Sequence, residues 1–354
     1  MPYQRKKTRK IKIGSMFVGG DSPVSVQSMT NTDTKNVTET VAQIRRLTES
    51  GCELVRCAVY DTACADAIPD IKKRIDIPLV ADIHFDHRLA VAAIKRGADK
   101  IRINPGNIGK KDAVLEVVRA AKDFGVPIRV GVNAGSLEKD LLKQYGRPTA
   151  EALVKSAERN AGMLFEAGFD DIVVSMKSSS VPDCIQACRM FSGAFDYPLH
   201  LGVTEAGTYE TALIKASAAI GALLVDGIGD TVRVSVTGRP EQEIAAAKRI
   251  LQYAGVRRFG LEVVSCPTCA RTAIDVMDIA QQVEKKFGHI KKPLTVAVMG
   301  CTVNGPGEAK EADIGIAGGK SKSALFIKGE IVRHVDNEAI LSALADDIHR
   351  IISE

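Results

Sequence analysis

Three cysteines and one glutamate in the last quarter of the sequence have the residue types and spacing of a metal site. Cys266 and Cys269 form a Cys-x-x-Cys pair, and Cys301 begins a glycine-rich stretch that ends at Glu308. Thiolates bind zinc and iron–sulfur clusters, and a carboxylate oxygen can complete either ligand set. The sequence therefore predicts a metal centre held by these four residues.

Two kinds of metal centre fit this ligand set. A closed structural zinc site usually takes four cysteine or histidine ligands, and no histidine lies in these two loops. A cubane iron–sulfur cluster with three cysteines and a weaker oxygen ligand is chemically reasonable, because a substrate oxygen could displace that ligand. The residue pattern alone leaves both metals open, together with a third interpretation in which the thiols bind nothing.

The elements that precede these loops predict a barrel. Short apolar strands alternate with helical stretches eight times up to residue 253. Eight such units in about 230 residues are typical of an α/β fold, the (β/α)8 TIM barrel. A doubly wound open sheet is the alternative, but no Gly-x-Gly-x-x-Gly fingerprint follows the first strand. The predicted strands are 24–29, 54–59, 79–83, 100–104, 128–133, 172–177, 199–205 and 231–235.

Polar side chains gather at the C-terminal ends of these strands, where a barrel holds its active site. Basic residues inside a barrel are costly unless paired, and only Asp82 and Glu205 stand out as inward-facing acids. Converging arginines therefore indicate a polyanionic ligand, most simply a diphosphate. The residues expected at this mouth are Arg56, Asp82, His84, Arg102, Asn104, Arg129, Asn133, Lys177, Glu205, Arg233 and Ser235.

Two further elements frame the barrel. Residues 11–13 and 16–18 alternate between polar and apolar types, which predicts a hairpin that plugs the barrel floor. We place the barrel domain at residues 1–253 and a second, smaller α+β domain at 257–354. Apolar periodicity in that domain predicts helices over 272–287 and 339–352, and a buried strand over 294–299. The Cys-x-x-Cys pair then lies just before a helix N-terminus, which stabilises thiolates.

Composition limits the partners. The sequence has 48 basic and 43 acidic residues, a net charge of +5 that suits anionic small molecules or an acidic protein. Aromatic residues make up 5% and tryptophan is absent, which disfavours nucleic-acid binding. No apolar run is long enough for a membrane span, and no secretory signal is visible. The eight cysteines are then expected to be reduced thiols in a cytoplasmic compartment.

Several of these segments resemble one known enzyme family. Cys-Pro-Thr-Cys-x-Arg at 266–271 and Gly-Cys-x-Val-Asn-Gly-Pro-Gly-Glu-Ala at 300–309 resemble the signature loops of the 4-hydroxy-3-methylbut-2-enyl diphosphate synthases. The segments 26–32, 80–85 and 103–107 are similar to stretches of the same family, so the resemblance covers essentially the whole chain. The second loop also resembles part of sulfite and nitrite reductases, but their four cysteines and sirohaem are not suggested.

The resemblance implies a specific reaction. The family reduces 2-C-methyl-D-erythritol 2,4-cyclodiphosphate to (E)-4-hydroxy-3-methylbut-2-enyl diphosphate, opening the ring and removing a hydroxyl as water. Asp82 and Glu205 would be the acids nearest that hydroxyl, with Glu205 the better proton donor, and Glu308 would also be catalytic. A 4Fe-4S cluster would be bound by Cys266, Cys269, Cys301 and Glu308. The substrate would be bound by Arg56, His84, Arg102, Arg129, Asn133, Lys177 and Ser235.

The resemblance also implies partners. The family works as a head-to-tail homodimer, in which the cluster domain of one chain caps the barrel of the other. Electrons would come from flavodoxin or ferredoxin, both acidic carriers that suit the mild basicity of this chain. Two other function classes remain at this point: a zinc-dependent phosphate-binding enzyme or regulator, and a nucleic-acid-binding protein.

Overall fold

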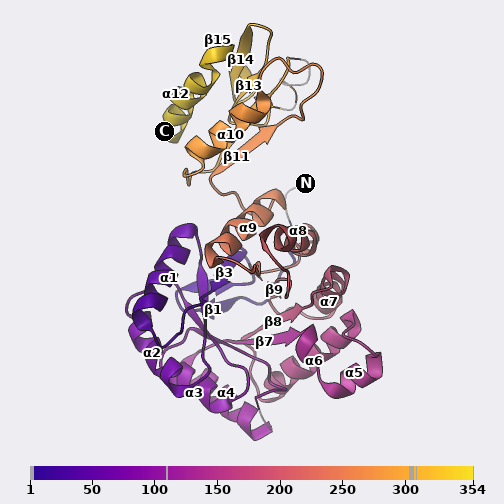
Figure 1. Ribbon diagram of the computed structural model, residues 1–354. Coiled ribbons are helices and arrows are strands. Elements are labelled where there is room, and N and C mark those ends of the chain that lie inside the picture. The colour runs from indigo at the N-terminus through magenta and orange to yellow at the C-terminus, as the bar shows by residue number, and fades with distance from the viewer. Residues whose placement is uncertain (1–3, 109–110, 303–306, 308, 354) are drawn as a thin grey trace. The chain divides into compact units, whose positions relative to one another are not determined.

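The computed structural model describes residues 4–108, 111–302, 307 and 309–353. The chain forms two compact units, Met1–Arg257 and Arg258–Glu354 (Figure 1). No helix in the described parts of the chain is long and apolar enough to cross a membrane.

The first unit is built on eight parallel strands in the order β8-β7-β6-β5-β4-β3-β10-β9. A bridge between Val174 and Leu199 joins the two ends of this order and closes the sheet into a barrel. The predicted (β/α)8 barrel is confirmed, although the last two strands are shorter than expected. The strands are β3 (Ser25–Met29), β4 (Leu54–Ala58), β5 (Leu79–Asp82), β6 (Lys100–Ile103), β7 (Ile128–Asn133), β8 (Ile172–Lys177), β9 (His200–Leu201) and β10 (Thr231–Val232).

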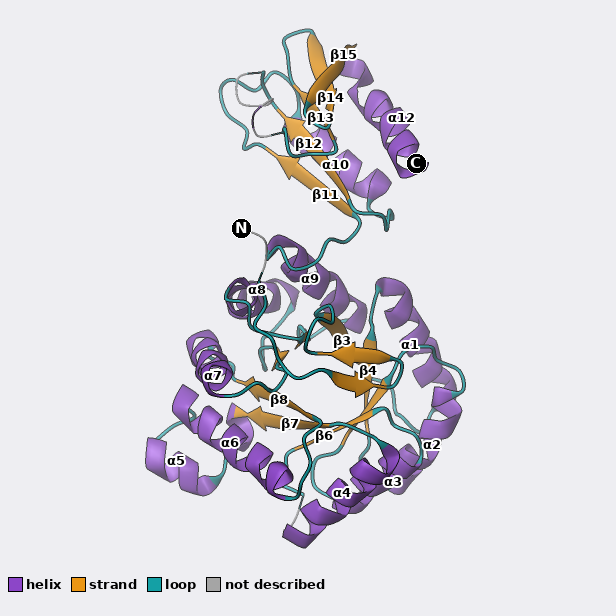
Figure 2. Ribbon diagram, turned by 180° about the vertical axis from the view of Figure 1, so that it is seen from behind, coloured by secondary structure: helices purple, strands orange, loops and turns teal. Residues whose placement is uncertain are grey.

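Helices follow the strands and lie outside the ring that they form (Figure 2). Five helices begin at a residue whose side-chain oxygen accepts a backbone N–H of the first turn, which stabilises the helix start. These N-cap residues are Asn36, Asp61, Asp86, Thr149 and Ser180. The helices are α1 (Val37–Ser50), α2 (Thr62–Lys72), α3 (His87–Lys95), α4 (Lys111–Phe124), α5 (Lys139–Tyr145), α6 (Ala150–Glu166), α7 (Val181–Ala194), α8 (Tyr209–Val225) and α9 (Pro240–Tyr253).

An antiparallel hairpin packs against the barrel, as the alternation of its residues predicts. It consists of β1 (Ile11–Ile13) and β2 (Met16–Val18). Its apolar residues form one buried cluster with strand residues that face the barrel interior. The cluster contains Ile11, Ile13, Val18, Leu54, Val80 and Val173. The hairpin thus closes the N-terminal end of the barrel with apolar side chains.

The second unit is a mixed α+β domain around a five-stranded sheet. The strands β11 (Leu261–Ser265), β12 (Leu294–Met299) and β13 (Ile314–Ala317) run parallel. The strands β14 (Lys322–Ile327) and β15 (Glu330–Asp336) extend the sheet antiparallel. The helices α10 (Val276–Phe287) and α12 (Ile340–Ser353) bury their apolar stripes with one face of the sheet in a single core.

The helix expected to begin at residue 272 begins at Val276 instead. Asp275 caps it by accepting the backbone N–H of Asp278, and the residues between the cysteine pair and this cap form turns. Cys269 therefore precedes the helix by seven residues. Stabilisation of the thiolates by the helix dipole stays a prediction, since the structure changes only the start of the helix.

Candidate functional site

A cavity of about 250 Å³ opens among residues at the C-terminal ends of the barrel strands. The residues that the resemblance assigns to substrate binding all line it, and so does Asp82. Arg233, which the strand pattern alone places at the mouth, lines it as well. The lining consists of Met29, Arg56, Asp82, His84, Arg102, Arg129, Asn133, Ser175, Lys177, Thr204, Arg233 and Ser235.

Strand register explains why these side chains meet. Alternate residues of a strand point to the same side, and parallel strands place their C-terminal ends together. Asp82 lies beside Arg102, and Arg102 lies beside Arg129, across neighbouring strands. Gly131 leaves room for the side chain of Arg102, because a Cβ at that position would lie 2.3 Å from its Nε.

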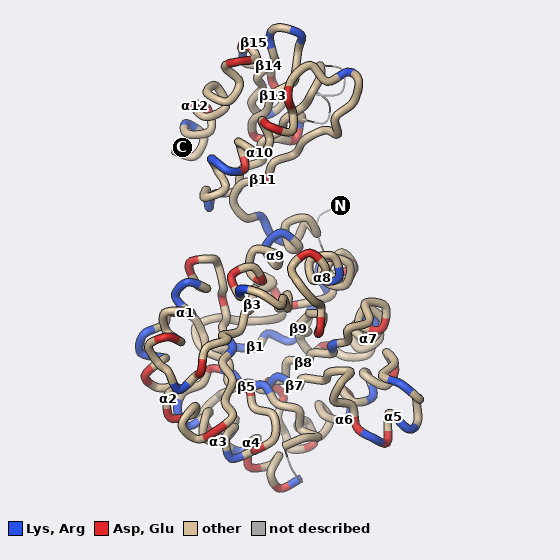
Figure 3. The backbone as a smooth tube through the Cα atoms, viewed as in Figure 1, with Lys and Arg blue, Asp and Glu red and all other residues tan. Residues whose placement is uncertain are grey.

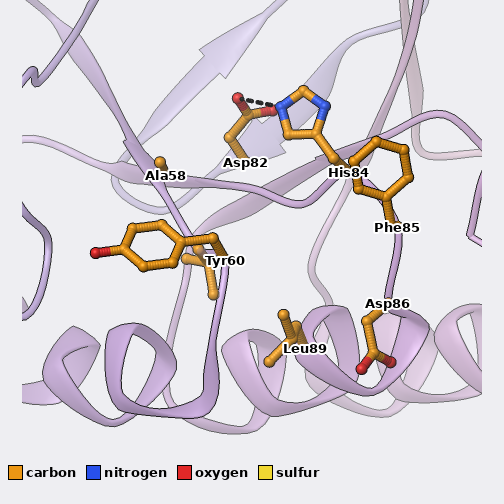
Figure 4. A pocket seen from close by; sticks show the side chains of 8 residues that line it. Ala58, Tyr60, Asp82, His84, Phe85, Asp86 and Leu89 are labelled. Carbon is orange, nitrogen blue, oxygen red and sulfur yellow. Dashed lines mark hydrogen bonds and ion pairs between the residues drawn. The ribbon is translucent and has the colours of Figure 1, made fainter.

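Asp82 is the carboxylate at the centre of the cavity wall. It is 3% exposed and lies 3.2 Å from Arg102 Nη1 and 3.7 Å from Arg56 Nε. Its Oδ2 also lies 3.3 Å from His84 Nε2 (Figure 4). Burial would raise the pKa of Asp82, but the charge of Arg56, the hydrogen bond from His84 and the charge of Arg102 hold it far below its ordinary value. Its neighbours thus favour the ionised form of Asp82, which forms ion pairs with Arg56 and Arg102 in return.

A second pocket of about 210 Å³ adjoins this cavity, and Asp82 and His84 line both spaces. Its remaining walls come from the segments after β4 and β5. They include Tyr60 and Phe85, whose rings are 56% and 77% exposed (Figure 4). The polar cavity therefore has an open, partly aromatic rim on one side.

Positive charge exceeds negative charge among the residues that line the cavity. Figure 3 shows where basic and acidic residues lie along the backbone. Among the described residues, two buried carboxylates, Asp82 and Glu243, form ion pairs with the cations that line the cavity. The five cations are Arg56, Arg102, Arg129, Lys177 and Arg233. Five cations against two carboxylates give a net excess of three positive charges, which is the electrostatic environment that a phosphate-bearing anion requires.

Arg129 and Lys177 carry most of the uncompensated charge. Burial lowers the pKa of both groups well below their ordinary values, and neighbouring arginines lower it further. Arg129 is 1% exposed, and its Nε and Nη1 have no hydrogen-bond partner within the described chain. A bound anion would supply the missing acceptors and the missing countercharge.

Glu205 lies at the rim, outside the lining of the cavity. The predicted strand 199–205 ends at Leu201, so Glu205 belongs to the loop that follows. Its side chain is exposed, and its Oε1 would lie 4.0 Å from a Cβ at Gly135, in the loop after β7. Its backbone has φ of 52°, a left-handed conformation that is uncommon for a non-glycine residue and is frequent at functional sites.

The second unit brings the two cysteine loops to one edge of its sheet. Ser265 is in register with Val298 on the neighbouring parallel strand, so both strands end at the same place. The backbone N–H of Gly300 donates to Cys266 Sγ at 3.1 Å. Cys266 is half-buried, and Cys269 is exposed. A backbone hydrogen bond from Arg271 and the charge of that residue lower the pKa of Cys269.

The complete ligand set cannot be assembled from the described residues. Cys301 directly follows Gly300 and is half-buried, but Glu308 lies outside the described residues. Among those that are described, no three His, Cys, Asp or Glu residues are arranged to hold a metal ion. The metal centre therefore stays a prediction, while the approach of the two cysteine loops is established.

The fold and the cavity define a class of protein: a (β/α)8 barrel with a mouth lined by cations, followed by a smaller cysteine-bearing α+β domain. Family comparisons specify it further. Residues 8–248 match the GcpE TIM-barrel domain, and residues 262–350 match the GcpE protein C-terminal domain. The chain belongs to the GcpE family.

Full-length relatives agree with this assignment. The chain is 56% identical to a 4-hydroxy-3-methylbut-2-en-1-yl diphosphate synthase (flavodoxin) of Caldanaerobacter subterraneus subsp. tengcongensis, covering all of both chains. It is also 56% identical to the Clostridium perfringens enzyme of the same name, covering 98% of this chain and 99% of that one. The predicted resemblance is confirmed, and the chain is an enzyme of this family.

A solved structure supports the barrel alone. Dihydropteroate synthase from Stenotrophomonas maltophilia superposes with a TM-score of 0.52 at 14% identity. The match covers 70% of this chain and 97% of that one. Since the identity is low, this likeness concerns the fold only.

Proposed function

We propose that this chain catalyses the reductive ring opening and dehydroxylation of 2-C-methyl-D-erythritol 2,4-cyclodiphosphate, giving (E)-4-hydroxy-3-methylbut-2-enyl diphosphate. The full-length relatives carry the name of this product, and the family match spans both domains. The single structural observation that carries the proposal is the cavity lined by five cations, which form ion pairs with two buried carboxylates among the described residues.

The cavity would bind the diphosphate group. Arg56, Arg102 and Arg129 offer planar N–H donors, and Lys177 offers a point charge, from the strands β4, β6, β7 and β8. His84, Asn133 and Ser235 add further hydrogen-bonding groups to the same wall. Since each charge-assisted hydrogen bond is worth about 1.5–3 kcal/mol, several together can hold a diphosphate against water.

The proton would be supplied from the rim. The reaction takes up two electrons and two protons, counted with the phosphates protonated, breaks a ring C–O bond and releases the hydroxyl as water. Glu205 is the better proton donor because it lies exposed beside the mouth, whereas Asp82 is held ionised by two arginines. Asp82 would keep the arginines in place during the reaction.

The cysteine loops fit an iron–sulfur cluster. The thiol of Cys269 has a lowered pKa, and Cys266 Sγ accepts a backbone N–H, as cluster thiolates commonly do. When bound, a 4Fe-4S cluster would pass electrons from the donor to the substrate one at a time. We propose Cys266, Cys269, Cys301 and Glu308 as its ligands. Glu308 would also be part of the catalytic site, because a substrate oxygen could displace this weaker oxygen ligand.

We propose flavodoxin as the electron donor, because the names of the relatives specify it, with ferredoxin as the alternative. We also propose a head-to-tail homodimer. The cavity and the cysteines belong to different units, so a complete site needs one unit of each kind brought together. Reduced cysteines and a reduced cluster further favour the cytoplasm as the compartment.

Turnover by anaerobically purified protein tests this proposal. Reduced flavodoxin and the cyclic diphosphate are added, and the linear diphosphate is followed by phosphorus NMR. We expect brown protein and product formation, whereas zinc-bound protein would be colourless. Brown protein that leaves the cyclic diphosphate unchanged with both flavodoxin and ferredoxin would contradict the proposed reaction.

A further inference from the structure

A buried carboxylate behind the cavity holds one of the mouth cations. Glu243 on α9 is 4% exposed and does not line the cavity. It accepts two hydrogen bonds from Arg233, from Nε at 3.1 Å and from Nη2 at 2.9 Å. This paired contact fixes the plane of the guanidinium as well as its position.

The carboxylate of Glu243 also accepts hydrogen bonds from residues next to the cavity wall on both sides of Arg233. Ser28 Oγ donates to Glu243 Oε2 at 2.9 Å, and the backbone N–H of Val236 donates to Oε1 at 3.3 Å. Ser28 directly precedes a residue that lines the cavity, and Val236 directly follows another. Glu243 therefore joins two segments of the cavity wall, one at Ser28 and one from Arg233 to Val236.

The geometry leaves one edge of Arg233 for a ligand. A guanidinium has five N–H donors, and the contact with Glu243 uses the edge formed by Nε and Nη2. The edge formed by the two Nη groups remains, on a side chain that lines the cavity. That edge matches the spacing of two phosphoryl oxygens.

We propose that Glu243 is a positioning residue, which directs the free edge of Arg233 toward the diphosphate of the substrate. The proposal rests on the proposed function, because it takes the cavity as the diphosphate site. An ion pair with a merely structural role would affect the unfolding temperature and leave ligand affinity unchanged. The two roles therefore differ in what a substitution changes.

Glu243→Gln tests the proposal in the full-length protein. Glutamine keeps an oxygen acceptor for Ser28 or Val236, but its amide cannot accept the paired contact from Arg233. We expect the Kd for inorganic diphosphate, measured by calorimetry, to rise about tenfold, with a similar rise in KM and a nearly unchanged kcat. A matched control is Glu241→Gln, because Glu241 lies on the same helix and pairs with the exposed Arg46. The control should leave the Kd unchanged.

A double-mutant cycle shows whether Glu243 affects diphosphate affinity through Arg233 or independently of it. In an Arg233→Met background, Glu243→Gln should cause no further loss of affinity. A Kd that is unchanged by Glu243→Gln alone overturns the proposal, and so does an equal loss in both backgrounds. If Glu243→Gln does not fold, the variant Arg233→Lys is used for the affinity measurement in its place. Lysine keeps the positive charge but cannot form the paired contact with Glu243. Wild-type affinity in Arg233→Lys overturns the proposal, and wild-type protein that binds no diphosphate overturns the proposed function as well.

Discussion

Arg129→Met should make the ligand-free protein more stable and the protein a poorer binder of diphosphate. The side chain of Arg129 is 1% exposed, and two of its nitrogens lack partners within the described chain. Methionine has a similar length and removes the buried charge, together with its repulsion of Arg56 and Arg102.

The size of the effect follows from the two unpartnered nitrogens. A buried donor without a partner costs about 1–3 kcal/mol, so removing two of them should raise the free energy of unfolding of the variant by about 2–6 kcal/mol. For a barrel unit of this size, each kcal/mol raises the unfolding temperature by about 2–4 °C. Scanning calorimetry of the full-length protein without ligand measures that rise.

The same variant should lose its response to ligand. Inorganic diphosphate at one hundred times its Kd should stabilise the wild-type protein by about 2.7 kcal/mol, and Arg129→Met by much less. Arg159→Met serves as the control, because Arg159 is an exposed residue that pairs with Asp140 at 2.8 Å. A variant that is less stable than wild type without ligand, or that keeps the full response to diphosphate, would refute the reasoning about buried charge.

Three further predictions concern other residues of the site. Glu205→Gln should lower kcat about 100-fold while the Kd for diphosphate stays unchanged. A fall in kcat accompanied by an equal weakening of diphosphate binding would argue against a proton donor at the rim. Cys269→Ser should abolish the visible absorption of reconstituted protein and keep diphosphate binding; retained absorption would count against ligation by this thiol. The neighbours of Asp82 lower its pKa in the folded protein below the value of about 3.9 that it has in the unfolded chain. The stability that ionised Asp82 contributes should therefore be fully present above about pH 3.9 and decline as the pH falls below that value. Denaturant titrations should therefore show a lower free energy of unfolding for Asp82→Asn than for the wild type, by a constant amount from pH 5 to 8. Below pH 4 this difference should narrow. A difference that changes between pH 5 and 8 would contradict the assigned ionisation.

The mouth of the barrel could be predicted from the sequence because two simple regularities determine it. Alternate residues of a strand share a face, and parallel strands in a barrel end together, so Arg56, Asp82 and Arg102 had to meet. Glu243 could not be found in the same way. It lies on a helix, ten residues beyond Arg233, and only the packing of α9 against the barrel brings the two together.

Local signals also misplaced two boundaries. The apolar stretch 199–205 resembles a full strand, but its pairing with neighbouring strands ends at Leu201, so Glu205 lies in a loop. The helix of the second domain starts at its cap, Asp275, because a side chain that accepts a backbone N–H outweighs the weak helical preference of the residues before it. The cysteine loops were brought together as predicted, while ligation by Glu308 stays a prediction.

The hairpin at the barrel floor has a consequence for kinetics. Ile11 and Ile13 seal the N-terminal end with apolar side chains, so the cavity communicates with solvent through its mouth. Substrate and product must use the same opening and meet the same arginines, and one can enter only after the other has left. The linear diphosphate should therefore inhibit competitively with the cyclic one, and its departure is a candidate for the slowest step at high substrate concentration.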